Sequence, residues 1–377
     1  HQLSTRLLRQ YDLLIEKSGG GVLQPVGAVV WFPFLVKAAC SNFIACIRPE
    51  DTFDSRFLVY AHYHLYEARV TTRSIKQTTG IQNLDTELYF DEPIAYPTRD
   101  EQRRIAFFLD CKTGCIDGII AKKRHQLELL EEERAALITQ AVTKGLDRNV
   151  EMKDSGVTWL GRVPKHWTTA KLKWFLGLND GGTWGEEPDD SDDDGTIVLR
   201  STELLIDGSW SLEGAACRKL SEVEKTQRKL EYGDILVTKS SGSVAHIGKA
   251  GFVTKRIEEM GCCFSNFMQR LRVKVSVSSR FLYWYLNCSV GREQMLFLAS
   301  TTTGLRNLSE TTLSEIKLAM PPVSEQEAIA GFLDCKTTHI DTLIDKIRQS
   351  IDTLQEYRSA LISAAVTGQI DVREEVV

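Results

Sequence analysis

Four short stretches contain residue types that could do chemistry, and we first tested each against the pattern that its chemistry requires. Residues 242–250 (GSVAHIGKA) follow a strand-like run, as a phosphate-binding loop would. The glycine spacing differs from that of such a loop, and Ala250 stands where the magnesium-binding serine or threonine is needed. Residues 320–323 (MPPV) resemble the tetrapeptide of amino-methyltransferases but lack its polar first and aromatic fourth residues. We interpret them as the break before a helix.

The other two stretches offer a nuclease cluster and a metal site. Residues 315–317 (EIK) could belong to a carboxylate and lysine cluster, but a charged helix face explains them as well. Zinc ligands four residues apart are offered by Cys111 with Cys115 and by Cys335 with His339, although a structural zinc site needs four ligands together. The sequence predicts a non-catalytic chain that binds no cofactor and no metal ion.

The composition is that of a folded protein of two or three domains. The chain has 377 residues, of which 42% are hydrophobic and 26% charged. Nine cysteines without a CxxC pair favour a reducing, cytoplasmic location. The most apolar stretch, residues 27–36, is shorter than the roughly 18 residues that a membrane span needs.

The charge is distributed unevenly, which keeps a nucleic-acid partner open. The net charge is -5, but residues 186–194 alone contain seven acids, so the rest of the chain sums to -5 + 7 = +2. Between residues 218 and 274, twelve lysines and arginines face six acids. A ligand meets the local charge rather than the average.

An internal repeat organises the chain. Residues 101–147 align without gaps to residues 325–371, with 25 identities in 47 positions at an offset of 325 - 101 = 224. Upstream, YDLLIEKSGG from Tyr11 matches GDILVTKSSG from Gly233. The chain is therefore a tandem repeat in which a diverged globular part precedes a preserved helix. The first copy lacks a match to roughly seventy residues of the second, so we expect its globular part to be truncated.

The preserved segments predict two long helices that pair with each other. Capping boxes are expected at Thr98 with Glu101 and at Ser324 with Glu327. Apolar positions then recur at the 4,3 spacing of a coiled coil, with one arginine in each seam that we expect to select the register. The seam residues are Ile116, Ile120, Leu127, Leu130, Arg134, Leu137, Ile340, Ile344, Ile347, Ile351, Leu354, Arg358 and Leu361. A pseudo-twofold between the copies predicts an antiparallel pairing.

The diverged segments predict globular parts of mixed α+β structure. Strands are expected at residues 196–199, 234–238 and 269–277, and short helices at residues 279–288 and 291–299.

The whole pattern resembles the DNA-specificity subunits of type I restriction-modification systems. The resemblance rests on the motif EQ…IA.FLD..T..ID…L.E.R.ALI..AVT, present from Glu101 and again from Glu325, and on the segments DSGV, WLG and VPKHW between residues 154 and 167. It implies an α+β fold with two target-recognition domains, the first truncated at its N-terminal end, separated by a long antiparallel two-helix coiled coil. The expected segments are residues 1–97 (partial recognition domain 1), 98–150 (helix 1 and linker), 151–322 (recognition domain 2) and 323–377 (helix 2).

The resemblance also implies a function and partners. Such a chain binds double-stranded DNA at a two-part target and positions two methyltransferase subunits and the restriction and translocase subunits. S-adenosylmethionine, ATP and magnesium would be bound by those partners. Side chains that can read base edges lie on loops that recur in both copies. These candidates are Lys239, Ser240, Ser241, Ser243, His246, Thr301, Thr302, Thr303, Arg306 and Asn307 in the second copy, and Lys17, Ser18, Thr78, Thr79, Gln82 and Asn83 in the first.

Two alternatives remain open from the sequence. The chain could be a coiled-coil scaffold whose end domains bind other proteins or carbohydrate, or an inactive, truncated paralogue without DNA specificity that pairs with a second copy. Steeply salt-dependent DNA affinity would distinguish a DNA reader from a scaffold.

Overall fold

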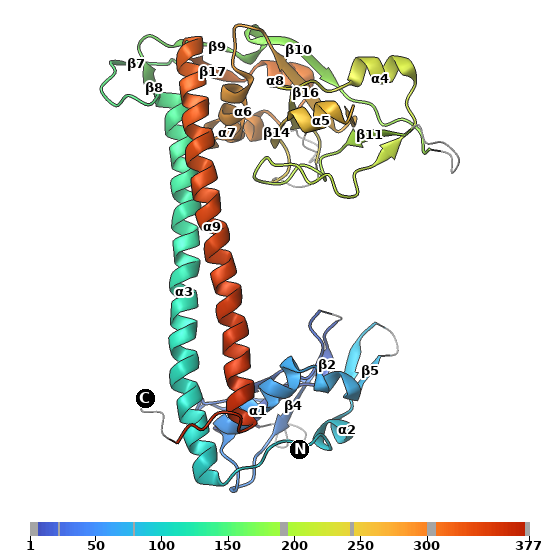
Figure 1. Ribbon diagram of the computed structural model, residues 1–377, viewed down its shortest axis with the longest axis vertical. Coiled ribbons are helices and arrows are strands. Elements are labelled where there is room, and N and C mark those ends of the chain that lie inside the picture. Colours follow the sequence, from blue (N-terminus) through green and yellow to red (C-terminus); the bar gives the residue numbers. More distant parts are fainter. Residues whose placement is uncertain are drawn as a thin grey trace. The chain divides into compact units, whose positions relative to one another are not determined.

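The computed structural model describes residues 7–21, 23–77, 80–188, 195–241, 245–299 and 307–373. The chain forms two compact units: unit 1 comprises residues 1–127 and 344–377, and unit 2 comprises residues 128–343. Two long helices, α3 (Arg99–Lys144) and α9 (Val323–Val366), contribute to both units. Each unit pairs the start of one helix with the end of the other, so the helices run antiparallel (Figure 1).

Unit 2 is built on a four-stranded antiparallel sheet. Its strand order is β10 (Leu176–Gly181), β16 (Met268–Val273), β13 (Ile235–Thr238) and β14 (Ala250–Phe252). Three smaller sheets accompany it: β12 (Cys217–Arg218), β11 (Thr196–Leu199) and β15 (Cys263–Phe264); β17 (Lys317–Met320) with β9 (Thr168–Lys171); and β7 (Met152–Asp154) with β8 (Arg162–Pro164).

Two helices pack the core of unit 2 against the long helices. They are α6 (Ser279–Asn287), which Ser278 caps by accepting from the Phe281 amide, and α7 (Ser289–Leu298). A Cβ on Gly291 would lie 2.2 Å from the Tyr285 carbonyl oxygen, so the close crossing of α6 and α7 requires glycine there. Short helices α4 (Glu222–Arg228), α5 (Lys255–Glu259) and α8 (Glu310–Ser314) and the 3-10 turn η3 (Leu172–Trp174) lie between the strands.

Unit 1 repeats this plan with fewer elements. Its first sheet has the order β3 (Val29–Trp31), β1 (Leu13–Glu16), β4 (Ile44–Ile47), and its second has the order β2 (Ser18–Gly19), β6 (Gln82–Leu84), β5 (Ile75–Gln77). The helices are α1 (Ser55–Glu67) and α2 (Thr86–Phe90), with the 3-10 turn η2 (Val70–Ser74). The mixed α+β class is confirmed, as are the strands and short helices expected in unit 2, with β16 ending earlier than expected.

An ion pair between a buried aspartate and a partly exposed arginine occurs in both units. Asp12 and Asp234 precede β1 and β13, and they accept from Arg48 Nη2 at 2.7 Å and from Arg272 Nε at 2.6 Å. Both carboxylates are almost fully buried. Burial raises the pKa of Asp12, but hydrogen bonds from Arg48 and the Arg9 amide bring this pKa below its usual value. The two copies of the sequence repeat therefore build corresponding strands with the same charge pair.

The seam expected from the 4,3 spacing faces inward in both helices. Every apolar seam residue is buried or half-buried. In unit 1 the members of α3 and α9 form one cluster, which contains Ile116, Ile120, Leu127, Ile347, Ile351, Leu354 and Leu361. The two helices thus fit a coiled coil.

The two helix starts differ, and only one expected capping box is present. At α3 the Thr98 amide donates to Glu101 at 3.0 Å and Thr98 Oγ1 accepts from the Glu101 amide at 3.4 Å, as expected. The box expected at Ser324 is wrong, because α9 begins at Val323 and Ser324 already lies inside the helix. The position that matches Thr98 is Pro322, which has no hydroxyl for a cap.

All nine cysteines lie within the described residues and carry free thiols. None of the helices in the described part of the chain is long and apolar enough to cross a membrane.

A buried histidine makes the stability of unit 1 depend on pH. Burial lowers the pKa of His62 to about 4, and its Nδ1 lies 2.6 Å from the Tyr89 hydroxyl. The unfolded chain, with a histidine pKa of about 6.5, binds the proton more readily. The free energy of unfolding should therefore fall as the pH drops from about 6.5 to about 4, by up to about 1.4 kcal/mol per pH unit.

Denaturant unfolding of His62→Leu at several pH values tests this prediction, since unit 2 has Leu286 at the matching position. The variant should lose this part of the pH dependence, whereas His125→Leu, at an exposed site on α3, should keep it. Parallel pH curves for the wild type and His62→Leu would contradict the assignment.

Candidate nucleic-acid interface

In unit 2 the structure brings two of the predicted loops together at the end of β13. The Lys239 amide donates to the Phe267 carbonyl at 3.0 Å, and the Lys239 carbonyl accepts from the Leu308 amide at 2.7 Å. Next to this contact, Ser240 and Asn307 form an isolated antiparallel bridge. The backbone thereby fixes one lysine, one hydroxyl and one carboxamide side by side.

Unit 1 builds the same arrangement at the end of β1. The Lys17 amide donates to the Phe43 carbonyl at 2.9 Å, and the Lys17 carbonyl accepts from the Leu84 amide at 2.8 Å. Ser18 pairs with Asn83 between β2 and β6, and Ser18 Oγ donates to Asn83 Oδ1 at 2.7 Å. Each of these sets joins two loops, so we call each set a loop pair. The loop pair of unit 1 is Lys17, Ser18 and Asn83, and the loop pair of unit 2 is Lys239, Ser240 and Asn307.

The side chains of the loop pairs differ in their exposure. Asn83 and Asn307 are exposed, whereas both lysines and both serines are half-buried. Gln82 departs from the expectation of an outward-facing reader. It is only 6% exposed, and its Oε1 accepts from the Val26 amide at 3.2 Å, so it supports the loop from inside.

The structure describes only some of the other residues that were predicted to contact DNA bases. Ser241 and His246 are half-buried. Thr78, Thr79, Ser243, Thr301, Thr302, Thr303 and Arg306 lie outside the described residues.

The lysine of residues 242–250, the stretch that resembles a phosphate-binding loop, has a structural role. Lys249 is buried, and its ammonium donates to the carbonyls of Ser201, at 3.2 Å, and of Leu204. Burial lowers the pKa of Lys249. A lysine held in this way cannot reach a bound phosphate, which agrees with the mismatch in the loop's sequence.

The other stretches that were considered for catalysis or metal binding also have structural roles. Residues 320–323 end β17 and start α9, as interpreted from the sequence. Glu315 binds Lys171 at 2.5 Å, and this contact lowers the pKa of Glu315. Cys111 and Cys115 lie in unit 1, whereas Cys335 and His339 lie in unit 2. Within the described ranges, no three histidine, cysteine or acidic side chains group as metal ligands would.

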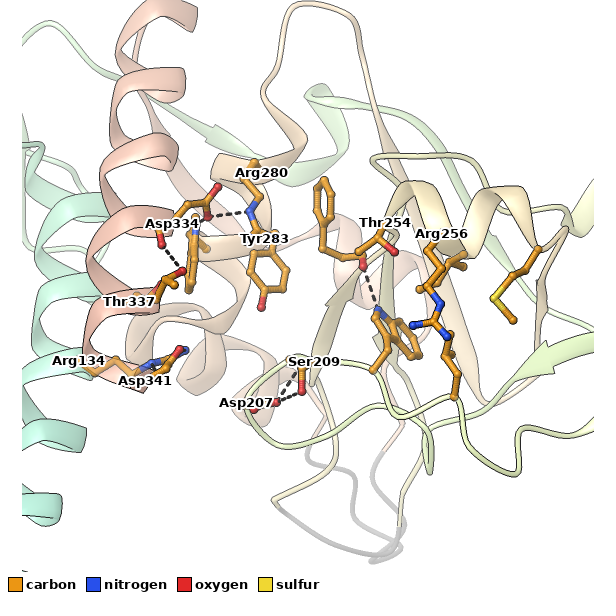
Figure 2. Close-up of a pocket in the computed structure, with 18 of the residues that line it drawn as sticks. Arg134, Asp207, Ser209, Thr254, Arg256, Arg280, Tyr283, Asp334, Thr337 and Asp341 are labelled. Atoms are coloured by element: carbon orange, nitrogen blue, oxygen red, sulfur yellow. Dashed lines mark hydrogen bonds and ion pairs between the residues drawn. The ribbon is translucent and has the colours of Figure 1, made fainter. Parts of the chain in front are cut away.

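Sequence reasoning missed the polar contacts that join each globular part to its long helix. In unit 2, Asp334 on α9 accepts from Arg280 Nε at 2.8 Å and from Trp284 Nε1 at 2.9 Å. Figure 2 shows Arg280 reaching from α6 toward Asp334 across the wall of an open hollow of about 650 Å³. Deeper in the junction, Gln326 accepts from the Ser278 amide at 2.8 Å and donates to the Pro321 carbonyl at 2.8 Å.

Unit 1 makes the same contacts at an offset of 224 residues. Asp110 accepts from Arg56 at 2.9 Å and from the Tyr60 hydroxyl at 2.9 Å. Gln102 accepts from the Asp54 amide at 2.8 Å and donates to the Pro97 carbonyl at 2.9 Å. The glutamine and the aspartate belong to the motif that both helices preserve, and this preservation was the signal that could have identified them.

The seam arginines pair with aspartates of the opposite helix. Arg134 Nε donates to Asp341 at 2.8 Å, as Figure 2 shows beside the hollow, and Arg358 Nε donates to Asp117 at 2.9 Å. Two of the arginines that line the hollow, Arg134 and Arg280, are thus each paired with an aspartate. These paired charges fit a structural junction between α6 and the long helices better than a binding site for a free anion.

Comparison with known proteins identifies the family. The sequence model of the type I restriction modification DNA specificity domain matches residues 164–353. The chain belongs to this family. The matched residues include the loop pair of unit 2, whereas the loop pair of unit 1 is related to it through the internal repeat.

Relatives from the specificity family cover most of the chain. The type I restriction enzyme EcoBI specificity subunit of Escherichia coli is 32% identical over 335 residues, which are 85% of this chain and 67% of that protein. The EcoKI specificity subunit of Escherichia coli (strain K12) is 22% identical over 95% of this chain and 75% of its own length. The StySPI specificity subunit of Salmonella potsdam is 25% identical over 95% and 74%.

Two solved structures share the fold. A chain from a study of complex assembly and conformational transition of the type I restriction-modification system superposes with a TM-score of 0.69 at 15% identity, over 97% of this chain and 83% of that chain. The HsdS subunit from Thermoanaerobacter tengcongensis gives a TM-score of 0.51 at 16% identity, over 97% and 82%.

The paired seam charges predict a measurable coupling between α3 and α9. Arg134→Glu places an acid opposite Asp341, so the free energy of unfolding should fall. The double variant Arg134→Glu/Asp341→Arg should recover part of it. Because both partners are partly exposed, the coupling energy should be about 0.2–1 kcal/mol. A double-mutant cycle by denaturant unfolding measures it, and Arg358 with Asp117 provides the matched pair. Additive single effects at both pairs would exclude a register role.

Proposed function

We propose that this chain is a sequence-specific DNA-binding subunit that reads a two-part target, with one loop pair for each half. The observation that carries the proposal is that the loop pair is built twice with the same backbone hydrogen bonds, in a chain of the DNA specificity family. A reader with two similar domains needs a common frame that presents side chains to two separate DNA segments.

The lysines and the asparagines of the loop pairs are suited to different contacts with DNA. Lys17 and Lys239 are suited to phosphate contacts, which supply affinity without sequence information. Asn83 and Asn307 carry carboxamides, which can bond an adenine edge in two places. The exposure of both asparagines supports this assignment.

The long helices fit a role in spacing and assembly. We infer that the globular parts act as target-recognition domains and that the antiparallel helices set the distance between them. Two methyltransferase subunits and the restriction and translocase subunits would dock on this frame. They would bind S-adenosylmethionine, ATP and magnesium, while this chain would catalyse nothing itself. Such a complex acts on cellular DNA, so we place it in the cytoplasm.

The salt dependence of DNA binding tests the phosphate contacts. Each phosphate contact that is lost should reduce the slope of log affinity against log salt by about 0.9. We therefore expect Lys17→Gln and Lys239→Gln each to flatten the slope by about that amount. Lys336→Gln, at an exposed position on α9 outside the loop pairs, should leave it unchanged. The measurement is a fluorescence-anisotropy titration of duplex DNA at several salt concentrations. A flat slope for the wild type would favour a protein-binding scaffold.

Methylation mapping tests which half of the target each unit reads. With the partner subunits present in cells, Asn307→Ala should relax the bases in one half of the methylated motif, and Asn83→Ala should relax the other half. Loss of a bidentate base contact costs about 1–3 kcal/mol of discrimination. Asn149→Ala, exposed in the linker after α3, serves as the control. An unchanged motif in both loop variants, with methylation intact, would remove these asparagines from base reading.

A further inference from the structure

A short turn is kept in both globular parts although the sequence around it differs. Between residues 36 and 52 the offset of 224 gives four identities, which are Ser41, Asn42, Phe43 and Arg48. Arg48 is explained by its ion pair with Asp12. The other three identities lie in a turn that leads into β4, and residues 265–267 lead into β16 in the same way.

The backbone of this turn is the same in both units. The Ile44 amide donates to the Ser41 carbonyl at 3.3 Å, and the Met268 amide donates to the Ser265 carbonyl at 3.0 Å. Serine is favoured at the first position of such a turn, and asparagine is common in turns. Turn chemistry therefore explains the serine and the asparagine, but it does not explain the phenylalanine that follows them in both units.

Packing in the core does not explain the phenylalanine either. Phe43 and Phe267 are each 55% exposed. Exposed apolar side chains of unit 1 are not generally repeated in unit 2, since Phe90 is also 55% exposed and Ser314 stands at its matching position. An exposed aromatic ring that recurs at the same point of two diverged domains indicates a ligand that both domains contact.

Each of these phenylalanines lies beside a loop pair. The Phe43 carbonyl accepts from the Lys17 amide at 2.9 Å and from the Ser18 amide at 3.2 Å. The Phe267 carbonyl accepts from the Lys239 amide at 3.0 Å. The exposed ring is therefore carried by the same backbone junction as the lysine, the serine and the asparagine of its loop pair. A ligand that contacts these polar side chains is brought close to the ring.

We propose that Phe43 and Phe267 contact DNA directly, each by stacking its ring on a base next to the loop pair of its unit. This inference rests on the proposed function, in which the loop pairs bind DNA. In a duplex the face of a base is reached only where a base step opens, so each ring acts as a wedge that partly unstacks one step. The chain thus deforms its target at one place in each half.

The chemistry of the ring favours stacking over contact with a base edge. A phenyl ring has no hydrogen-bond donor or acceptor, so at a base edge in the major groove it can contact only a thymine methyl group. Stacking requires no particular base, because every base has a π face. Two domains that read different halves of a target carry the same side chain here, which fits a contact that is independent of sequence.

Affinity and its salt dependence distinguish the rings from the lysines. The probe is a duplex that carries the motif methylated in cells by the wild-type complex. Phe43→Ala and Phe267→Ala should each weaken binding about tenfold, because one stack between a base and an aromatic ring is lost. The slope of log affinity against log salt should stay unchanged, since no phosphate contact is lost. Phe107→Ala, also at a 55% exposed position but with Gly331 as its repeat mate, should bind like the wild type.

Fluorescent base analogues in the same duplex report the unstacking. Each duplex carries either 2-aminopurine in place of one adenine or pyrrolocytosine in place of one cytosine, so that every base pair is probed in turn. Binding of the wild-type chain should raise the fluorescence at one step in each half of the motif. Phe43→Ala should abolish the rise in one half, and Phe267→Ala should abolish it in the other. Phe267→Leu, which keeps an apolar side chain without a π face, should also bind several-fold more weakly.

Two results would overturn the proposal and leave the proposed function intact. The first is wild-type affinity in both Phe→Ala variants, with normal unfolding transitions. The second is a loss of affinity without a rise in fluorescence at any step in the wild-type complex. A thymine preference that disappears from the motif in that case would assign the rings to methyl groups. A flat salt slope for the wild type, or the absence of a methylated motif, would contradict the proposed function itself.

Discussion

Each globular part of this molecule depends on a pair of polar contacts with the start of a long helix. A buried glutamine, Gln102 or Gln326, receives the first amide before α1 or α6 and returns a hydrogen bond to the chain just before the long helix. Two turns later, Asp110 or Asp334 binds an arginine and an aromatic donor of the same short helix. Buried amides left without partners cost free energy, so the short helix has one favourable position.

This constraint explains why the long helices of the two repeats stay alike while the globular parts diverge. The glutamine and the aspartate of the motif hold the globular part, and the later aspartate, Asp117 or Asp341, pairs with the arginine of the opposite helix. A change at any of these positions affects two elements at once. A change in an exposed loop side chain affects neither. The frame can therefore remain constant while the loop pairs acquire different side chains.

Sequence reasoning recovered the features that depend on local periodicity and on self-comparison. The seam of α3 and α9, the strand β11 and the match of Tyr11 with Gly233 all follow from spacing or from repetition within the chain. Contacts between residues distant in sequence were not recovered. Nothing local to Arg56 indicates that it binds Asp110, and nothing in the composition of residues 81–84 indicates that Gln82 lies inside while Asn83 lies outside.

The failed capping box shows how one substitution redirects a neighbouring group. Thr98 supplies the hydroxyl and amide that hold Glu101, and these hydrogen bonds lower the pKa of Glu101. In unit 2, Pro322 cannot make this bond, and the matching carboxylate of Glu325 is free to receive His166 and Trp167. The acid at this repeat position thus caps a helix in unit 1 and holds an imidazole and an indole in unit 2. The carboxylate has hydrogen-bond partners in both units, although these partners come from different parts of the repeat.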